Sequence, residues 1–242
     1  MEAQAQKRKT RSDKGPKITD RDLDALEWIA EQYAISIDHL CILLARLGDP
    51  DDRAPKEQGR ITEKRAMYIV RRWEQLGLIQ KAWILHGQPA WLWLTPEALR
   101  LVSEQLGELR YYAPTPATIN HIYYCNHARL FIEARRQGAK WTGERILKAS
   151  MQKVERGSRR PHMPDATVWT NGRLIAVEVE LSVKRPGQLD KILHDLALNA
   201  EYGTVWYFTR ERSTKAIKQA IATMQAMYNQ KFVVYDLDEM PL

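Results

Sequence analysis

The chain has 242 residues, 44% of them hydrophobic, and carries 37 Lys and Arg against 30 Asp and Glu, a net charge of +7. This length and apolar content suit one or two domains with ordinary packed cores. No apolar run approaches the ~20 residues that span a bilayer, and no apolar segment follows the basic N-terminus as in a secretory signal. With only two cysteines, Cys41 and Cys125, a disulfide framework is excluded. We therefore expect a cytoplasmic protein without a membrane partner.

The positive charge is unevenly distributed along the chain. Residues 1–17 carry a net +4, residues 60–76 a net +3 and residues 117–242 a net +6, whereas residues 18–59 carry −6. An excess gathered in a tail, one short segment and the C-terminal half favours a polyanionic partner, and nucleic acid is the simplest one.

The first hundred residues predict helices followed by a hairpin. Residues 1–17 lack aliphatic periodicity and predict a disordered basic tail. Apolar residues at helical spacing then predict three helices: Thr19 or Asp20 to about Tyr33, Ser36 or Asp38 to Gly48, and Thr62 to about Leu76. A polar loop at 48–60 separates the last two. Two β-rich runs, 78–84 and 90–94, flank a Gly/Pro turn and predict a hairpin, with a helix following from Thr95.

Three helices and a hairpin are the element order of a winged helix, a helix-turn-helix fold whose third helix lies in the major groove of double-stranded DNA. We assign residues 18–107 to this domain. The expected phosphate or base-edge contacts are Thr62, Lys64, Arg65, Arg71 and Arg72. Two alternatives remain open. The third helix is also compatible with an ordinary amphipathic helix with a solvated basic face, and winged helices also serve as protein-interaction modules.

The rest of the chain alternates between helices and strands. Residues 108–116 contain two prolines and predict a linker, after which 117–242 form a second domain. Its expected elements are a helix at 117–137, strands at 141–147, 165–170 and 174–181, a helix at 186–200, a strand at 204–208, a helix at 214–227 and a strand at 232–235. Asn171-Gly172 marks a tight hairpin between two of the strands. The pattern predicts an α/β fold with one mixed sheet, and an α+β chain overall.

One predicted strand carries two acidic residues on the same face. Side chains alternate along a strand, so Glu178 and Glu180 share the face opposite Val177 and Val179. Neighbouring carboxylates repel each other and favour a bound cation. Asp165, across the hairpin, would supply a third oxygen ligand to a divalent metal. The alternative is a solvated polar face of an edge strand.

Pro164-Asp165, followed about a dozen residues later by Glu178-Val179-Glu180 on a hairpin, resembles the PD-(D/E)xK nuclease superfamily. The resemblance implies Mg²⁺ on Asp165, Glu178 and Glu180 if cleavage is retained, with Glu144 completing the site. Glu180 occupies the position of the superfamily's catalytic lysine. Lys184 has the same strand parity and is the candidate replacement.

A narrower resemblance covers nearly the whole chain. A winged helix, a helix with His121 and Asn126, the Trp141-Thr-Gly-Glu-Arg segment, Pro164-Asp165 and Val-Glu-Val-Glu-Leu-x2-Lys together resemble the replication-relaxation family of plasmids and other mobile elements. This implies a DNA-binding protein that acts in replication, transfer or their control, with a nuclease-like domain that has lost cleavage. The alternative is a Mg²⁺-dependent endonuclease or nickase. Other replication, transfer or recombination proteins and a second copy of the chain are the further partners considered.

Additional residues are assigned to the same site. His121 is expected to contact the scissile phosphate or to pair with Glu144, and the alternative is a histidine with ordinary polar contacts on a half-buried helix. Arg156, Arg159 and Arg160 would hold the DNA backbone, unless they belong to a mobile basic loop. The histidines and cysteines never reach four ligands at zinc-finger spacing, so a structural zinc site is rejected.

Overall fold

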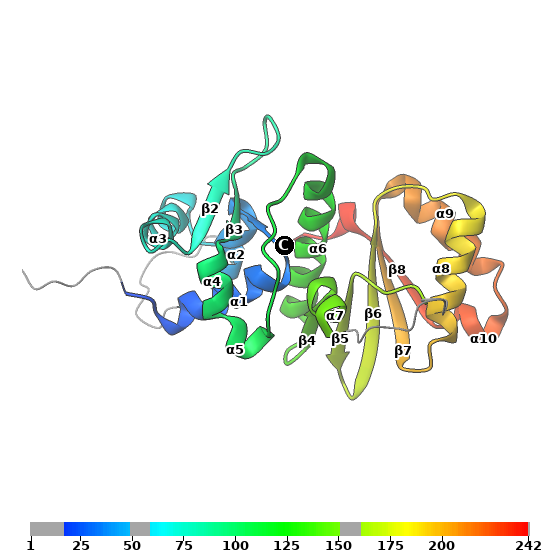
Figure 1. The fold of residues 1–242 in the computed structure, drawn as a ribbon. Coiled ribbons are helices and arrows are strands. Elements are labelled where there is room, and N and C mark those ends of the chain that lie inside the picture. Colours follow the sequence, from blue (N-terminus) through cyan, green and yellow to red (C-terminus); the bar gives the residue numbers. More distant parts are fainter. Residues whose placement is uncertain (1–16, 49–58, 151–160, 242) are drawn as a thin grey trace, which may run out of the picture.

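The computed structural model describes residues 17–48, 59–150 and 161–241 (Figure 1). Arg156, Arg159 and Arg160, the basic tail 1–16 and most of the polar loop lie outside these residues. Within the described part, ten α-helices accompany a five-stranded mixed sheet and a three-stranded antiparallel sheet, an α+β fold. No helix there is long and apolar enough to cross a membrane.

The first half begins with three capped helices. They are α1 (Asp20–Glu31), α2 (Ile37–Leu47) and α3 (Glu63–Gln75). The side chains of Thr19, Ser36 and Thr62 each accept a hydrogen bond from a backbone N–H of the helix that follows, as good N-cap residues do. These three predicted helices are confirmed. The first ends before the predicted Tyr33, whose backbone has turned to a φ of +70°.

A small sheet follows the helices. The predicted hairpin is confirmed as β2 (Ile79–Ala82) and β3 (Trp91–Leu94), and the loop between them extends from the body of the molecule (Figure 1). A two-residue strand that the sequence did not predict, β1 (Ile35–Ser36), pairs with the other edge of β3. Helices α4 (Pro96–Leu101) and α5 (Ser103–Leu106) complete this half.

The second half contains the larger sheet. Its elements are α6 (Pro116–Arg135), β4 (Lys140–Gly143), α7 (Glu144–Ser150), β5 (Ala166–Thr170), β6 (Arg173–Glu180), α8 (Pro186–Leu198), β7 (Tyr202–Thr209), α9 (Glu211–Ala222), α10 (Ala226–Asn229), β8 (Phe232–Asp236) and a final 3-10 turn at Leu237–Glu239. The sheet order is β4-β5-β6-β7-β8, antiparallel as far as β6 and parallel from β6 to β8.

The predicted strand at 141–147 was wrong beyond Gly143. A Cβ atom at Gly143 would lie 2.9 Å from the carbonyl oxygen of Glu31, so the chain passes close to the end of α1 there. It then turns into α7, whose residues Glu144 to Ala149 include several strong helix formers. The predicted helix at 214–227 was also inexact, because α9 ends at Ala222 and a separate short helix, α10, follows.

Helices cover both faces of the large sheet (Figure 1). Val177 and Val179 on β6 pack with Ile132 of α6 on one face. On the other face Tyr207 of β7 packs with Leu193 of α8, and α9 lies beside it. Because β6 is central and covered on both sides, Glu178 and Glu180 are buried rather than solvated on an edge strand.

Helix α6 is shared by the two halves. Its Leu130 belongs to the core of the first half, and Ile122 packs with Trp91, while Ile132 belongs to the sheet core. A helix that is apolar on more than one side is a buried helix. The two halves of the chain therefore contact each other extensively through α6. The segment that connects them contains no helix or strand from residue 107 to residue 115.

A buried arginine ties α6 to α1. The Arg129 guanidinium lies 2.8 Å from Glu31 Oε2 and 2.7 Å from Glu133 Oε1, and it is 4.6 Å from the ring centroid of Trp28. The Trp28 indole N–H also donates to Glu133, at 3.1 Å.

We expect Arg129→Ala to lower the free energy of unfolding by about 3–5 kcal/mol, because it leaves the carboxylate of Glu31 buried and without its partner. Exposed Lys140→Ala should change it by less than about 0.5 kcal/mol. Urea unfolding followed by circular dichroism measures both. Equal effects of the two substitutions would contradict a structural role for the ion pair.

Candidate functional site

Two carboxylates meet at the start of the β5–β6 hairpin. Asp165 precedes β5, and the pairing of Ala166 with Val177 brings it beside Glu178 on β6. The backbone N–H of Val179 donates to Asp165 Oδ2 at 2.7 Å. Glu178 is 7% exposed. Burial, and then the negative charge of Asp165, raise the pKa of the Glu178 carboxyl to about 7.

A histidine that the sequence analysis did not assign to the site holds Glu178. His162 Nε2 lies 2.8 Å from Glu178 Oε1, and the His162 backbone N–H donates to Asp195 on α8 at 3.2 Å. Burial alone would lower the pKa of His162, but the Glu178 carboxylate outweighs it and the pKa is raised. In the sequence, only its position three residues before Asp165 could have indicated that His162 belongs to the site.

Glu180 has its own partners. Its Oε1 accepts hydrogen bonds from the backbone N–H and the hydroxyl of Ser182, both at 3.1 Å, and its Oε2 forms an ion pair with Lys184. The positive charge of Lys184 also lowers the pKa of Glu178, so the amine lies close to both glutamates. The structure thus pairs Glu180 with Lys184, whereas Glu178 pairs with His162 and lies beside Asp165.

A buried tyrosine faces these acids. Tyr207 on β7 lies opposite Glu178, is almost fully buried, and its hydroxyl finds no hydrogen-bond partner among the described residues. Burial and the charges of Glu178, Glu180 and Asp165 raise the pKa of Tyr207 well above its ordinary value. A buried hydroxyl without a protein partner can still bond to water or to a ligand.

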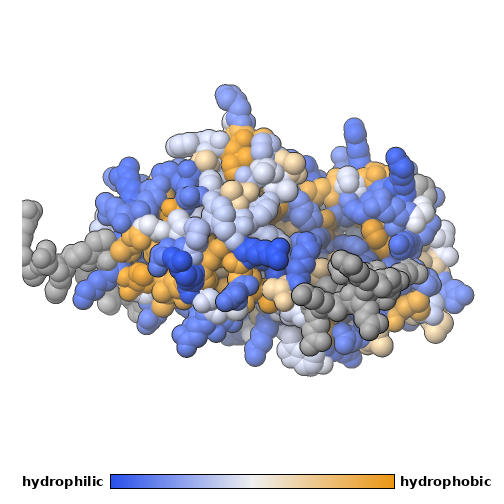
Figure 2. Space-filling model, in the orientation of Figure 1, coloured by the Kyte–Doolittle hydropathy of each residue, from blue (hydrophilic) through white to orange (hydrophobic). Residues whose placement is uncertain are grey.

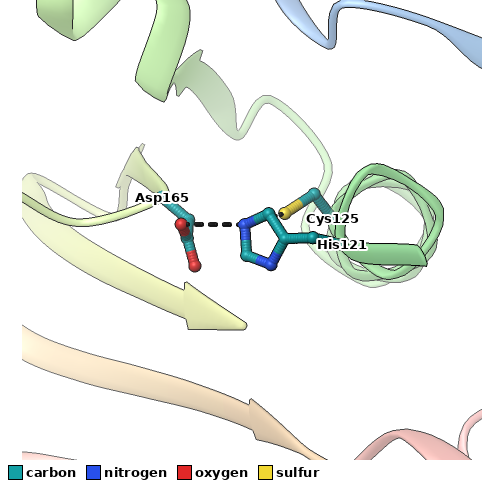
Figure 3. A group of neighbouring side chains, drawn as sticks. All are labelled: His121, Cys125 and Asp165. Carbon is teal, nitrogen blue, oxygen red and sulfur yellow. Dashed lines mark hydrogen bonds and ion pairs between the residues drawn. The ribbon is translucent and has the colours of Figure 1, made fainter. Parts of the chain in front are cut away.

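Helix α6 contributes a second group of side chains on the other side of Asp165. His121 Nε2 lies 3.0 Å from Asp165 Oδ1 and 3.4 Å from Cys125 Sγ, so both contacts involve the same ring nitrogen. Figure 3 shows the three side chains and the contact with Asp165. Burial opposes protonation of His121, whereas the Cys125 sulfur and the Asp165 carboxylate favour it, and together they raise the pKa of the imidazole. One expectation was that His121 pairs with Glu144. In the structure it pairs with Asp165 instead.

Glu144 lies nearby at the start of α7. Its carboxylate forms an ion pair with Lys148 and accepts a hydrogen bond from the Tyr33 hydroxyl at 3.2 Å, while its backbone N–H donates to the carbonyl oxygen of Asp165 at 2.7 Å. Glu144, His121, Cys125 and Asp165 line one cavity of about 460 Å³, which Tyr112 also lines. This cavity is where a ligand could reach the cluster.

The predicted DNA-binding residues on α3 are placed in different surroundings. Lys64, Arg65 and Arg71 are exposed, and Thr62 is the N-cap, its hydroxyl accepting from the Arg65 N–H at 3.3 Å. Arg72 instead forms an ion pair with Asp22.

Asp22 is completely buried and also accepts a hydrogen bond from the Trp73 indole N–H at 3.0 Å. The guanidinium of Arg72 is therefore engaged with a buried carboxylate of α1, and its assignment as a DNA contact stays a prediction.

The site rests on its own geometry, because no family model, no curated protein and no solved structure matches the chain.

We expect Asp165→Asn to lower the pKa of Glu178 below about 7, because it removes the negative charge that helps to raise it. His162→Gln should raise that pKa, since the histidine stabilises the ionised form. The pKa can be measured by NMR of ¹³C-labelled glutamate carboxyls in metal-free protein, with exposed Glu97 as the reference. An unchanged value in Asp165→Asn would mean that the charge of Asp165 does not contribute to the raised pKa of Glu178.

Proposed function

We propose that the protein binds double-stranded DNA through α3 and the β2–β3 hairpin, which together with α1 and α2 would form a winged helix. The observation that carries this proposal is the basic, exposed face of α3. Lys64, Tyr68 and Arg71 are spaced four and three residues apart, so they lie on one side of the helix. The opposite side, formed by Ala66, Ile69, Val70 and Trp73, is buried.

The exposed face of α3 has the composition of a DNA-contacting surface. Lys64 and Arg71 would neutralise phosphates, and Tyr68, which is 66% exposed, adds an aromatic side chain with a polar tip. Trp83, directly after β2, is 71% exposed, so the protruding hairpin also offers a large amphipathic side chain. In Figure 2 hydrophilic residues cover most of the projecting parts of the visible face.

The wider context of the proposal comes from the resemblance to the replication-relaxation family. By that resemblance the protein acts in replication, transfer or their control on a plasmid or another mobile element. Other proteins of these processes and a second copy of the chain are the proposed further partners.

A second candidate function is metal-dependent cleavage of DNA by a PD-(D/E)xK-like second domain. The paired carboxylates of Asp165 and Glu178 favour it. Their donor chemistry fits Mg²⁺, because both are carboxylates. Burial and the charge of Asp165 keep the pKa of Glu178 high, and a bound cation would offset both. The buried Tyr207 hydroxyl, without a partner among the described residues, also fits a site that holds a hydrated ion.

In this second candidate the chain's own residues have defined roles. Asp165 and Glu178 would hold Mg²⁺, which when bound polarises a phosphate and activates water. His162 orients Glu178 through its hydrogen bond. Glu180 positions the Lys184 amine, whose positive charge would offset the charge that develops on a phosphate. Glu180 thereby acts on the lysine and not as a metal ligand.

We expect the double variant Lys64→Glu, Arg71→Glu to bind duplex DNA at least about tenfold more weakly and to reduce the salt slope by about two, because two phosphate contacts are lost. The matched control is Lys215→Glu, Lys218→Glu on α9, which changes the net charge equally. Fluorescence anisotropy over a salt series measures both. Equal losses would show attraction by net charge alone, and no binding by the unaltered protein at ~100 mM salt would favour a protein-interaction module.

We expect nicking or linearisation of supercoiled plasmid with Mg²⁺ or Mn²⁺ if the second candidate is correct. Asp165→Ala and Glu178→Ala should abolish it, since each removes a metal ligand, while exposed Asp190→Ala on α8 should not. Agarose gels resolve the three plasmid forms. If no form is cut while salt-sensitive binding persists, the second domain has no cleavage activity and the first proposal stands alone.

A further inference from the structure

We propose that His121, Cys125 and Asp165 form a mononuclear site for a thiophilic transition metal of the Zn²⁺ type. This site goes beyond the proposed DNA binding and differs from the candidate Mg²⁺ site, with which it shares only Asp165. Its donors are an imidazole, a thiolate and a carboxylate, a set that suits Zn²⁺ and Co²⁺ and does not suit Mg²⁺.

The three donor atoms lie close together, and the two distances that involve the imidazole nitrogen are near tetrahedral spacing. The imidazole Nε2 is 3.0 Å from the carboxylate oxygen and 3.4 Å from the sulfur, and all three donor atoms lie within 4.8 Å of one another. Zinc bonds of about 2.0–2.3 Å in a tetrahedron place neighbouring donors roughly 3.3–3.6 Å apart. Metal entry would therefore require the imidazole nitrogen to move outward from its two neighbours by a few tenths of an ångström, with the sulfur and the carboxylate oxygen drawn to the same tetrahedral separation.

Two rigid elements position these donors. His121 and Cys125 are four residues apart on α6, so they lie on the same side of the helix, one turn apart. Asp165 is fixed by the Val179 N–H, which holds the carboxylate oxygen that does not contact His121. Hydrogen bonds of this kind orient metal ligands in known sites.

The geometry argues against a Cys-His-Asp nucleophilic triad. In such a triad the imidazole contacts the acid through one ring nitrogen and the nucleophile through the other. Here Nε2 faces both Asp165 and Cys125 (Figure 3). Donors that converge on one point are arranged as ligands around an ion and cannot relay a proton through the ring.

The site is open to a ligand. All three residues line the cavity of about 460 Å³, and the His121 side chain is 45% exposed. Three protein ligands leave a fourth tetrahedral position for water or an anionic oxygen, as in catalytic zinc sites. The absence of four ligands at zinc-finger spacing does not bear on a three-ligand site of this kind.

Cobalt binding to the metal-free full chain tests the proposal. We expect one equivalent of Co²⁺ to produce a thiolate-to-cobalt charge-transfer band and tetrahedral visible bands, and Zn²⁺ to displace it. The chain has two cysteines, so the sulfur can be assigned. Cys125→Ser should lose the charge-transfer band, whereas Cys41→Ser should retain it. His121→Ala should weaken Co²⁺ binding at least about tenfold, and exposed His194→Ala should not.

The outcomes separate this proposal from the proposed function. Glu178→Gln removes a candidate Mg²⁺ ligand and none of the three donors, so its cobalt spectrum should be unchanged. No charge-transfer band in the unaltered protein, or a band that survives Cys125→Ser, overturns the metal site and leaves the DNA-binding experiment unaffected. Conversely, a chain that binds no DNA but shows the cobalt band retains the metal site and loses the proposed function. Circular dichroism of each variant confirms that it is folded.

Discussion

The burial of α6 between two cores is the constraint on which the rest of the structure depends. A helix with apolar residues on more than one side needs a partner on each, and α6 finds one in the first helical core and another in the large sheet. Arg129 and Asn126 fix its position, the first through Glu31 and the second by donating to the Ala34 carbonyl oxygen at 2.8 Å. These contacts hold His121 and Cys125 at a set distance from Asp165, which belongs to a different element.

The acidic cluster persists in a buried setting because each carboxylate has a basic or donor partner of its own. Asp165 contacts His121, Glu178 contacts His162, and Glu180 contacts Lys184. Burying an unpaired carboxylate costs free energy of desolvation, and each of the three short-range pairs offsets part of that cost. The pairing is incomplete at Glu178, where the charge of Asp165 still contributes to a pKa of about 7. Tyr207 adds a hydroxyl without a partner among the described side chains. A cation bound beside Glu178 and Tyr207 would therefore stabilise the ionised carboxylate more than one bound at the other two pairs.

Periodic features of the fold could be predicted from the sequence, and contacts between distant segments could not. Helical spacing of apolar residues located α3, and strand alternation together with Asn171-Gly172 located β5 and β6. The site residues Asp165 and Glu178 followed from that hairpin. Helix α7 was missed because Gly143 ends the strand through a close contact with α1, which no local pattern reveals. The ion pair of Arg72 could not be predicted for the same reason, since its partner Asp22 lies fifty residues earlier.

The contacts of α6 and α7 with the first helices also determine when the chain can fold during synthesis. Ala34 bonds to a residue 92 positions later, Trp28 to one 105 positions later and Ala30 to one 115 positions later. The N-terminal helices emerge from the ribosome first, so their apolar surfaces stay exposed until the partner residues have been translated. The nascent chain can complete its first core only once α6 has emerged. Arg145 of α7 then donates a hydrogen bond to the carbonyl oxygen of Ala30. A chain whose synthesis ended before that point would expose the hydrophobic face that α6 otherwise covers.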